Sequence, residues 1–189
     1  MNRPTFQILM LLTVILVVIM TVVLFAVRHA NRQIPGLSAW AYSYLLGLLV
    51  CFNFLARPHV PEGLSVVITQ VLMFSSAWLN LAAARAYAGR PPWPLAYFGW
   101  AVITVAGLSS HLTWPQPEPT LRLALGLGAA GTLMLLSAQA MLSAELRRQP
   151  ERYLFTLACG GHGLLMLATA LTLLLGQADL ADPERLGTV

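Results

Sequence analysis

Six long apolar segments, separated by short connections, make up most of the chain. A helix needs about 20 mostly apolar residues to cross a bilayer. Proline, glycine and arginine mark the connections, as in "RPHVPEG" and "GRPPWP". This pattern predicts an all-α fold, a polytopic membrane helix bundle with six transmembrane helices. The predicted spans are residues 5–27, 36–56, 64–87, 95–114, 120–144 and 153–176.

The composition indicates that the surrounding solvent is lipid. Charged residues make up 10% of the chain and hydrophobic residues 58%, whereas a soluble domain has about 25% charged residues. The first apolar run is too long for a signal peptide and has no cleavage site after it, so an uncleaved helix is expected. The net charge of +4 is scattered along the chain, which argues against a nucleic-acid partner.

The distribution of arginine predicts the topology. Seven of the eleven basic residues, all of them arginines, follow the first, third and fifth spans, and four lie in the other polar segments. The positive-inside rule then puts those three connections in the cytoplasm and both termini outside. Residues 1–178 form the predicted transmembrane domain, and 179–189 an outward-facing polar tail or the start of a loop to a further helix.

A small set of polar side chains lies inside the predicted spans. Amides in a membrane usually hydrogen-bond a neighbouring helix, so helix contact is the simpler interpretation of this set. The alternative is that Gln70, Asn80 and His162 line a small polar cavity that opens outward, with His162 as a ligand or pH sensor. The set consists of Asn53, Gln70, Asn80, Gln139 and His162.

Small residues in the fifth and sixth spans predict close helix packing. The stretch "GLGAAG" at 126–131 matches a dinucleotide-binding pattern, but that chemistry needs a preceding strand and a helix N-terminus facing phosphate. Inside a span the same residues let another helix approach. Oligomer contacts are expected to use these faces. The residues are Gly126, Ala130, Gly131, Gly160 and Gly163.

Catalytic, haem and metal sites are poorly matched by the sequence. Ser109 and His162 faintly resemble the serine and histidine of rhomboid intramembrane proteases, but Ser110 stands where a glycine is required. A haem b would need two histidines at one depth, and His111 lies nearer the surface than His162. Two cysteines in apolar runs show no metal-ligand spacing. No catalytic residue, metal or cofactor is therefore expected in these residues.

Several segments resemble the N-terminal multi-pass membrane region that precedes a GGDEF domain in many proteobacterial diguanylate cyclases. They are "RHANRQIPGLSAWAYSYLL", "VPEGLSVVITQVLMFSSAWLNLAAARAYAGRPP", "TWPQPEPTLRLAL" and "LRRQPERYLF". The resemblance covers nearly the whole chain and rests on leucine-rich helices with a few turn residues.

The resemblance implies a sensory, anchoring and protein-interaction module in the bacterial inner membrane. Its attached cytoplasmic enzyme would join two GTP, with Mg²⁺, into cyclic di-GMP. The GGDEF signature is absent from these 189 residues, so that domain would lie outside this chain, after a seventh helix. The implied partners are the lipid bilayer, further copies in a homo-oligomer and other membrane proteins. The alternative is a stand-alone integral membrane protein that binds haem b or lipid, or serves as a subunit of a complex.

Overall fold

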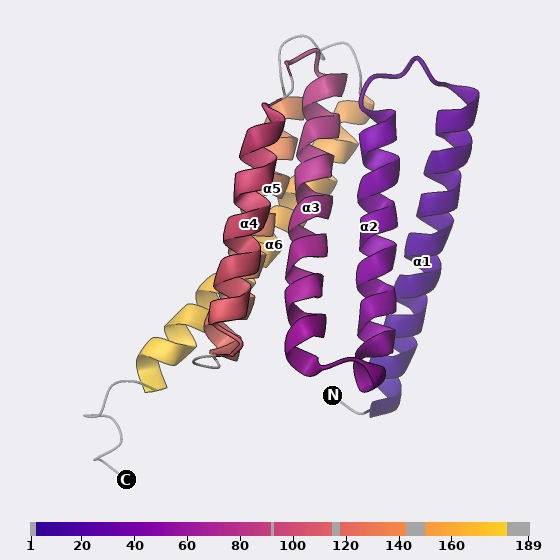
Figure 1. Ribbon diagram of the computed structural model, residues 1–189. Coiled ribbons are helices and arrows are strands. Elements are labelled where there is room, and N and C mark those ends of the chain that lie inside the picture. The colour runs from indigo at the N-terminus through magenta and orange to yellow at the C-terminus, as the bar shows by residue number, and fades with distance from the viewer. Residues whose placement is uncertain (1–2, 92, 115–117, 143–149, 181–189) are drawn as a thin grey trace.

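The computed structural model describes residues 3–91, 93–114, 118–142 and 150–180, and every regular element in these ranges is a helix (Figure 1). Five of the helices are long and apolar enough to cross a membrane, which confirms the all-α class and makes this a membrane protein by length and composition. The elements are α1 (Arg3–Ala30), α2 (Leu37–Ala56), the short 3-10 helix η1 (Arg57–His59), α3 (Glu62–Tyr87), α4 (Leu95–His111), α5 (Pro119–Met141) and α6 (Glu151–Leu180).

The predicted spans fall on the observed helices, but α4 is shorter than expected. The span predicted at 95–114 ends as a helix at His111, after 17 residues. At about 1.5 Å per residue such a helix is roughly 25 Å long, less than the hydrocarbon thickness of about 30 Å. At the other end of the chain α6 continues to Leu180, into the predicted tail, of which residues 181–189 lie outside the described residues.

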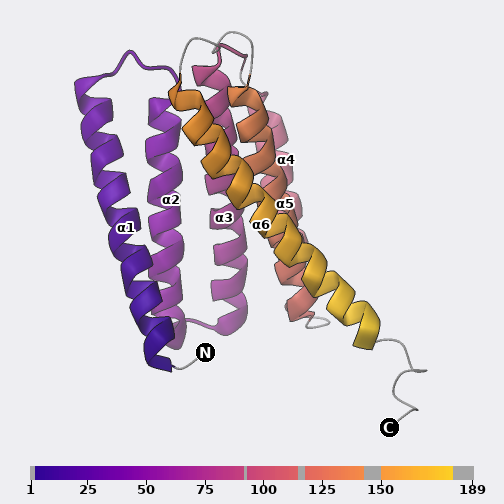
Figure 2. The same ribbon diagram turned by 180° about the vertical axis from the view of Figure 1, so that it is seen from behind.

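Consecutive helices run in opposite directions, and α3 occupies the centre of the bundle (Figures 1 and 2). Helix α3 packs against α2, α4 and α5, while α6 packs on α5 and α1 on α2. Aromatic rings hold α4 and the residues before it to α3. The ring centroid of Trp78 lies 5.6 Å from that of Phe98 in α4 and 5.2 Å from that of Trp93, two residues before α4. Helix α4 meets α5 only marginally, and this leaves space between them.

The core is built mainly from α3 and α5. Phe74, Ala77 and Leu81 of α3 pack with Ala130 and Leu133 of α5 in one buried cluster. The small side chains let the two helices come close together. Between helices in a membrane there is no hydrophobic driving force, so the van der Waals contacts of this close packing stabilise the pair.

Arginines gather at one end of the bundle, which we call the arginine end. They belong to the end of α1 and its connection, the end of α3 and its connection, and the start of α6 (Figure 1). Several stack on aromatic rings: Arg28 lies 5.0 Å from the ring of Tyr42, and Arg85 lies 5.1 Å from that of Trp93. Cation–π contacts of this kind suit the membrane interface. The arginine end consists of Arg28, Arg32, Arg85, Arg90 and Arg152.

Candidate functional site

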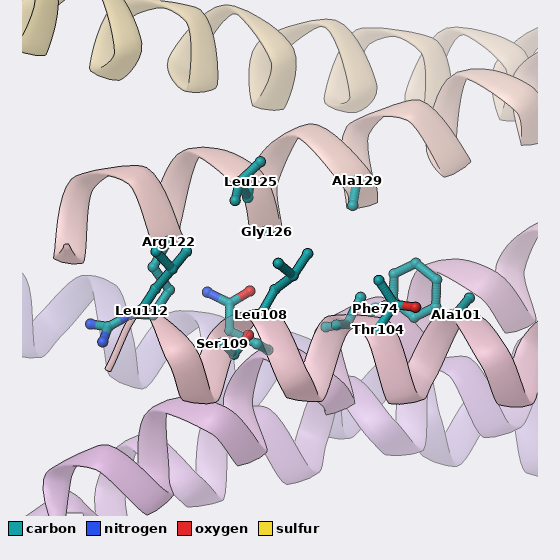
Figure 3. A pocket seen from close by; sticks show the side chains of 12 residues that line it. Phe74, Ala101, Thr104, Leu108, Ser109, Leu112, Arg122, Leu125, Gly126 and Ala129 are labelled. Carbon is teal, nitrogen blue, oxygen red and sulfur yellow. The ribbon is translucent and has the colours of Figure 1, made fainter. Parts of the chain in front are cut away.

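A pocket of about 340 Å³ lies between α3, α4 and α5 (Figure 3). Most of its wall is apolar, and its volume is at the lower end of the range of about 300–1,000 Å³ found for ligand sites. We call it the α3–α4–α5 pocket. It is lined by Gln70, Phe74, Ala101, Thr104, Val105, Leu108, Ser109, Leu112, Arg122, Leu125, Gly126 and Ala129.

The polar residues of this pocket gather near the α4–α5 connection. Ser109 lies two residues before the end of α4, and Arg122 lies in the first turn of α5. Arg122 donates a hydrogen bond from Nη1 to Oγ1 of Thr113 at 2.9 Å. Gln70 reaches this region from α3 because the facing residue of α5 is Gly126, which has no side chain. A Cβ added at Gly126 would lie only 2.8 Å from Cδ of Gln70. One end of the pocket is therefore polar and cationic, and the other is apolar.

A second cavity, of about 510 Å³, lies around Asn80 of α3. The Asn80 side chain links three helices, since its Oδ1 accepts a hydrogen bond from Trp40 Nε1 at 3.0 Å and its Nδ2 donates to Met134 Sδ at 3.2 Å. A longer contact of 3.8 Å joins Nδ2 to Cys159 Sγ in α6. Asn80 is thus a helix-contact residue at the meeting point of α2, α3, α5 and α6.

His162 lines the same cavity as Asn80, but its side chain is exposed. Among the described residues it has no hydrogen-bond partner, so it is not a helix-contact residue held by a polar bond. The hypothesis of one cavity containing Gln70, Asn80 and His162 is wrong for Gln70, which lines the α3–α4–α5 pocket instead. Gln70 faces α4 and α5, whereas Asn80 and His162 share a cavity with α2 and α5.

The other two amides of the predicted set behave differently from each other. Asn53 of α2 donates from Nδ2 to the Ser65 carbonyl and to Thr69 Oγ1 of α3, both at 2.7 Å, so it binds the neighbouring helix. Gln139 is exposed near the end of α5.

The predicted packing glycines contribute to contacts within one protomer. A Cβ at Gly131 would lie 2.9 Å from the carbonyl oxygen of Gly163, and one at Gly163 would lie 2.9 Å from that of Gly131. Gly160 has only an ordinary contact, 3.7 Å from Cβ of Ala138. Because α5 and α6 already use the Gly131–Gly163 contact, a homo-oligomer would have to use another face.

Two polar residues that line the α3–α4–α5 pocket, Arg122 and Ser109, were not predicted to do so. Arg122 entered the sequence argument only as one arginine in a topology count, and Ser109 only as a possible nucleophile. The sequence did contain a signal for this arrangement. Ser109 lies shortly before the α4–α5 connection and Arg122 shortly after it, and a short connection brings the two helix ends together. His162 lines no part of this pocket, so the serine–histidine pair considered above is not assembled around it.

Replacing Asn80 by leucine is expected to destabilise the bundle by about 1–2 kcal/mol, because the indole N–H of Trp40 loses its acceptor in an apolar interior. Thermal unfolding of the purified protein in mild detergent measures the loss. In a Trp40→Phe background the same Asn80→Leu change should cost less, since the N–H is already absent. Equal costs in both backgrounds would contradict the assigned hydrogen bond.

Clusters of three or more possible metal-binding side chains are not found among the described residues. The cavity containing His162 is lined by no second histidine, so its geometry does not favour a bis-histidine haem.

No protein-family model, curated protein or solved structure matches the chain. The function is therefore argued from the arrangement of the residues themselves.

Proposed function

We propose that this chain is a membrane sensory, anchoring and protein-interaction module that regulates a cytoplasmic diguanylate cyclase domain. The resemblance to the membrane regions that precede GGDEF domains supports the nature of the output. The catalytic domain, with its GTP and Mg²⁺, would lie outside these residues, joined through a seventh helix. That helix would connect the bundle directly to the enzyme and would transmit the signal.

The structural observation behind this proposal is the gathering of arginines at one end of an alternating helix bundle, and it supports the orientation. Since the connections after α1 and α3 and the start of α6 share that end (Figure 1), the positive-inside rule favours a cytoplasmic arginine end. This orientation has an external N-terminus in a bacterial inner membrane and six crossings, with α4 as the shortest. The short α4 spans through local thinning of the bilayer or through its flanking aromatic residues.

The peripheral position of α1 supports the interaction role. This helix packs mainly on α2, and large apolar side chains on it are exposed, among them Leu12, Leu16 and Ile19. Lipid covers such a surface in the isolated protomer. A helix held by one neighbour also offers the broadest face for another membrane protein or a second copy.

We expect a cysteine at position 90 to be labelled from the cytoplasmic side only. In a Cys51→Ala, Cys159→Ala background, Arg90→Cys should react with a membrane-impermeant maleimide in inverted vesicles and not in intact spheroplasts. Arg57→Cys is the matched control and should show the reverse, because Arg57 begins η1, in the α2–α3 connection at the opposite end of the bundle (Figure 1). Labelling of Arg90→Cys from outside would invert the topology.

The regulatory output is tested with the full-length natural gene. Its expression should raise cyclic di-GMP, measured by mass spectrometry of cell extracts, and the increase should disappear when the GGDEF motif is altered. A gene that stops near codon 189, or a full-length product that leaves cyclic di-GMP unchanged, contradicts the proposed output.

A stand-alone lipid-binding membrane protein is the second candidate. The polar end and apolar wall of the α3–α4–α5 pocket favour it. A haem-binding version predicts a Soret band in the purified protein, and a spectrum without that band would remove haem from this alternative.

A further inference from the structure

The α3–α4–α5 pocket opens on the lateral surface of the bundle, between α4 and α5. Leu108 of α4 and Leu125 of α5 both line it (Figure 3), and their side chains are 48% and 44% exposed. Helix α4 packs on α3 and meets α5 only marginally, so these leucines form a rim that faces the bilayer. A ligand already dissolved in the membrane reaches the pocket without entering water.

Two buried polar side chains in the pocket make no side-chain hydrogen bond to any described residue. Gln70 and Ser109 are each 6% exposed. Within the described ranges neither the Gln70 amide nor the Ser109 hydroxyl makes a hydrogen bond. Neither polar group is fully enclosed by protein atoms in the described structure, so each is open to a hydrogen-bond partner from outside the protein. Both groups line the pocket, so a polar ligand there would satisfy them.

The charge at the polar end is positive. Arg122 gives one N–H to Thr113, while a guanidinium carries five. Glu118 precedes it by one helical turn, is exposed and forms no ion pair with it in the described structure. Arg122, Gln70 and Ser109 all line the pocket, and their N–H and O–H donors suit an anion with several oxygens, such as a phosphodiester.

The pocket is polar at one end and apolar at the other along the bundle axis, as a lipid is from its headgroup to its acyl chains. Arg122 and Ser109 lie near the helix ends, while Phe74, Ala101 and Ala129 line the part nearer mid-span (Figure 3). From Arg122 to Ala129 is seven residues, or about 10 Å of helix. The apolar part is therefore long enough for a segment of one acyl chain, with the polar end of the pocket at the level of the helix ends.

We propose that the α3–α4–α5 pocket binds an anionic phospholipid of the bilayer, with the phosphate near Arg122, Gln70 and Ser109 and part of one acyl chain against Phe74 and Ala129. The site would make the bundle sensitive to the anionic lipid content of one leaflet. This inference does not depend on the diguanylate cyclase output, because it concerns binding by the bundle itself.

Native mass spectrometry of the detergent-purified chain tests the proposal. Phosphatidylglycerol should bind with about tenfold higher affinity than phosphatidylcholine of the same chains. Both lipids carry a phosphodiester, but only phosphatidylcholine adds a quaternary ammonium, which the Arg122 guanidinium repels. Arg122→Gln should abolish most of this preference. Arg57→Gln should leave the preference intact, because Arg57 lies outside the pocket, in the α2–α3 connection, which shares its end of the bundle with the start of α5 (Figure 1).

Further measurements keep the test decisive. Ser109→Ala removes one donor with little change in volume, and it should weaken phosphatidylglycerol binding about threefold even if Arg122→Gln fails to fold. Equal binding of the two lipids by the unaltered protein, or equal losses from Arg122→Gln and Arg57→Gln, would overturn the site. Tighter binding of oleate than of phosphatidylglycerol would identify a free fatty acid as the ligand and would also overturn the proposal.

Discussion

Replacing Gly36 by alanine is expected to be among the most destabilising single changes in this protein. Gly36 precedes α2 with a φ of 83°, a left-handed conformation that costs a non-glycine residue about 1–2 kcal/mol. A Cβ there would also clash with the backbone of α3, lying 3.0 Å from the carbonyl carbon of Ala83. Because backbone atoms cannot move aside separately from their helix, overpacking adds about 1–3 kcal/mol.

Gly89→Ala separates the two contributions. Gly89 has a similar φ of 70°, but no atom lies within 4 Å of the position of a Cβ. We expect Gly89→Ala to lose only the conformational term, and Gly36→Ala to unfold at a clearly lower temperature in the same detergent. If the two variants unfold together, the close approach of the α1–α2 connection to α3 is wrong.

Alanine at either Gly131 or Gly163 is the second change with a large expected effect. In each case the new methyl group would lie 2.9 Å from the carbonyl oxygen of the other glycine. The α5 and α6 backbones would have to separate, at a cost of about 1–3 kcal/mol for each substitution. The loss is measured as a lower midpoint of thermal unfolding, followed by size-exclusion chromatography of the remaining monodisperse protein.

Two other glycines of the same helices provide matched controls. Gly128 of α5 and Gly161 of α6 have no atom within 4 Å of a Cβ position. Gly128→Ala and Gly161→Ala should therefore be neutral, or stabilising by up to about 1 kcal/mol through helix propensity. Equal destabilisation by all four alanines would show that helix interior position, and not the α5–α6 contact, decides the outcome.

The position of the helices could be read from the sequence because that signal is local. An apolar run of about 20 residues between turn residues has few alternatives to a helix in lipid, where every backbone polar group must be satisfied within its own segment. The predicted spans and the observed helices consequently agree closely. The clearest exception is α4, where the predicted span continues through Leu112 to Trp114 beyond the helix end at His111. Helix α5 likewise ends at Met141, before the predicted end at residue 144, and residues 143–144 lie outside the described residues. Apolar composition alone does not report where a short helix stops.

The assignment of polar side chains to sites required the tertiary structure. Gln70 and Asn80 stand ten residues apart on α3, which at 3.6 residues per turn leaves them roughly 80° apart around the helix axis. That angle is compatible with one cavity or with two. The neighbours decide: α4 and α5 surround Gln70, whereas α2, α5 and α6 surround Asn80.

The same distinction applies to the small residues and to Arg122. Their sequence positions predicted a close-packing face and a polar helix end, because glycine permits close approach in any context and arginine favours an interface. Whether Gly131 meets a second helix of the same chain, and whether Arg122 borders a pocket, depends on how α4, α5 and α6 cross. Those crossings are set by side-chain packing between segments far apart in the chain. The sequence by itself thus determined which segments are helices in lipid, and only the tertiary structure decided which side chains meet.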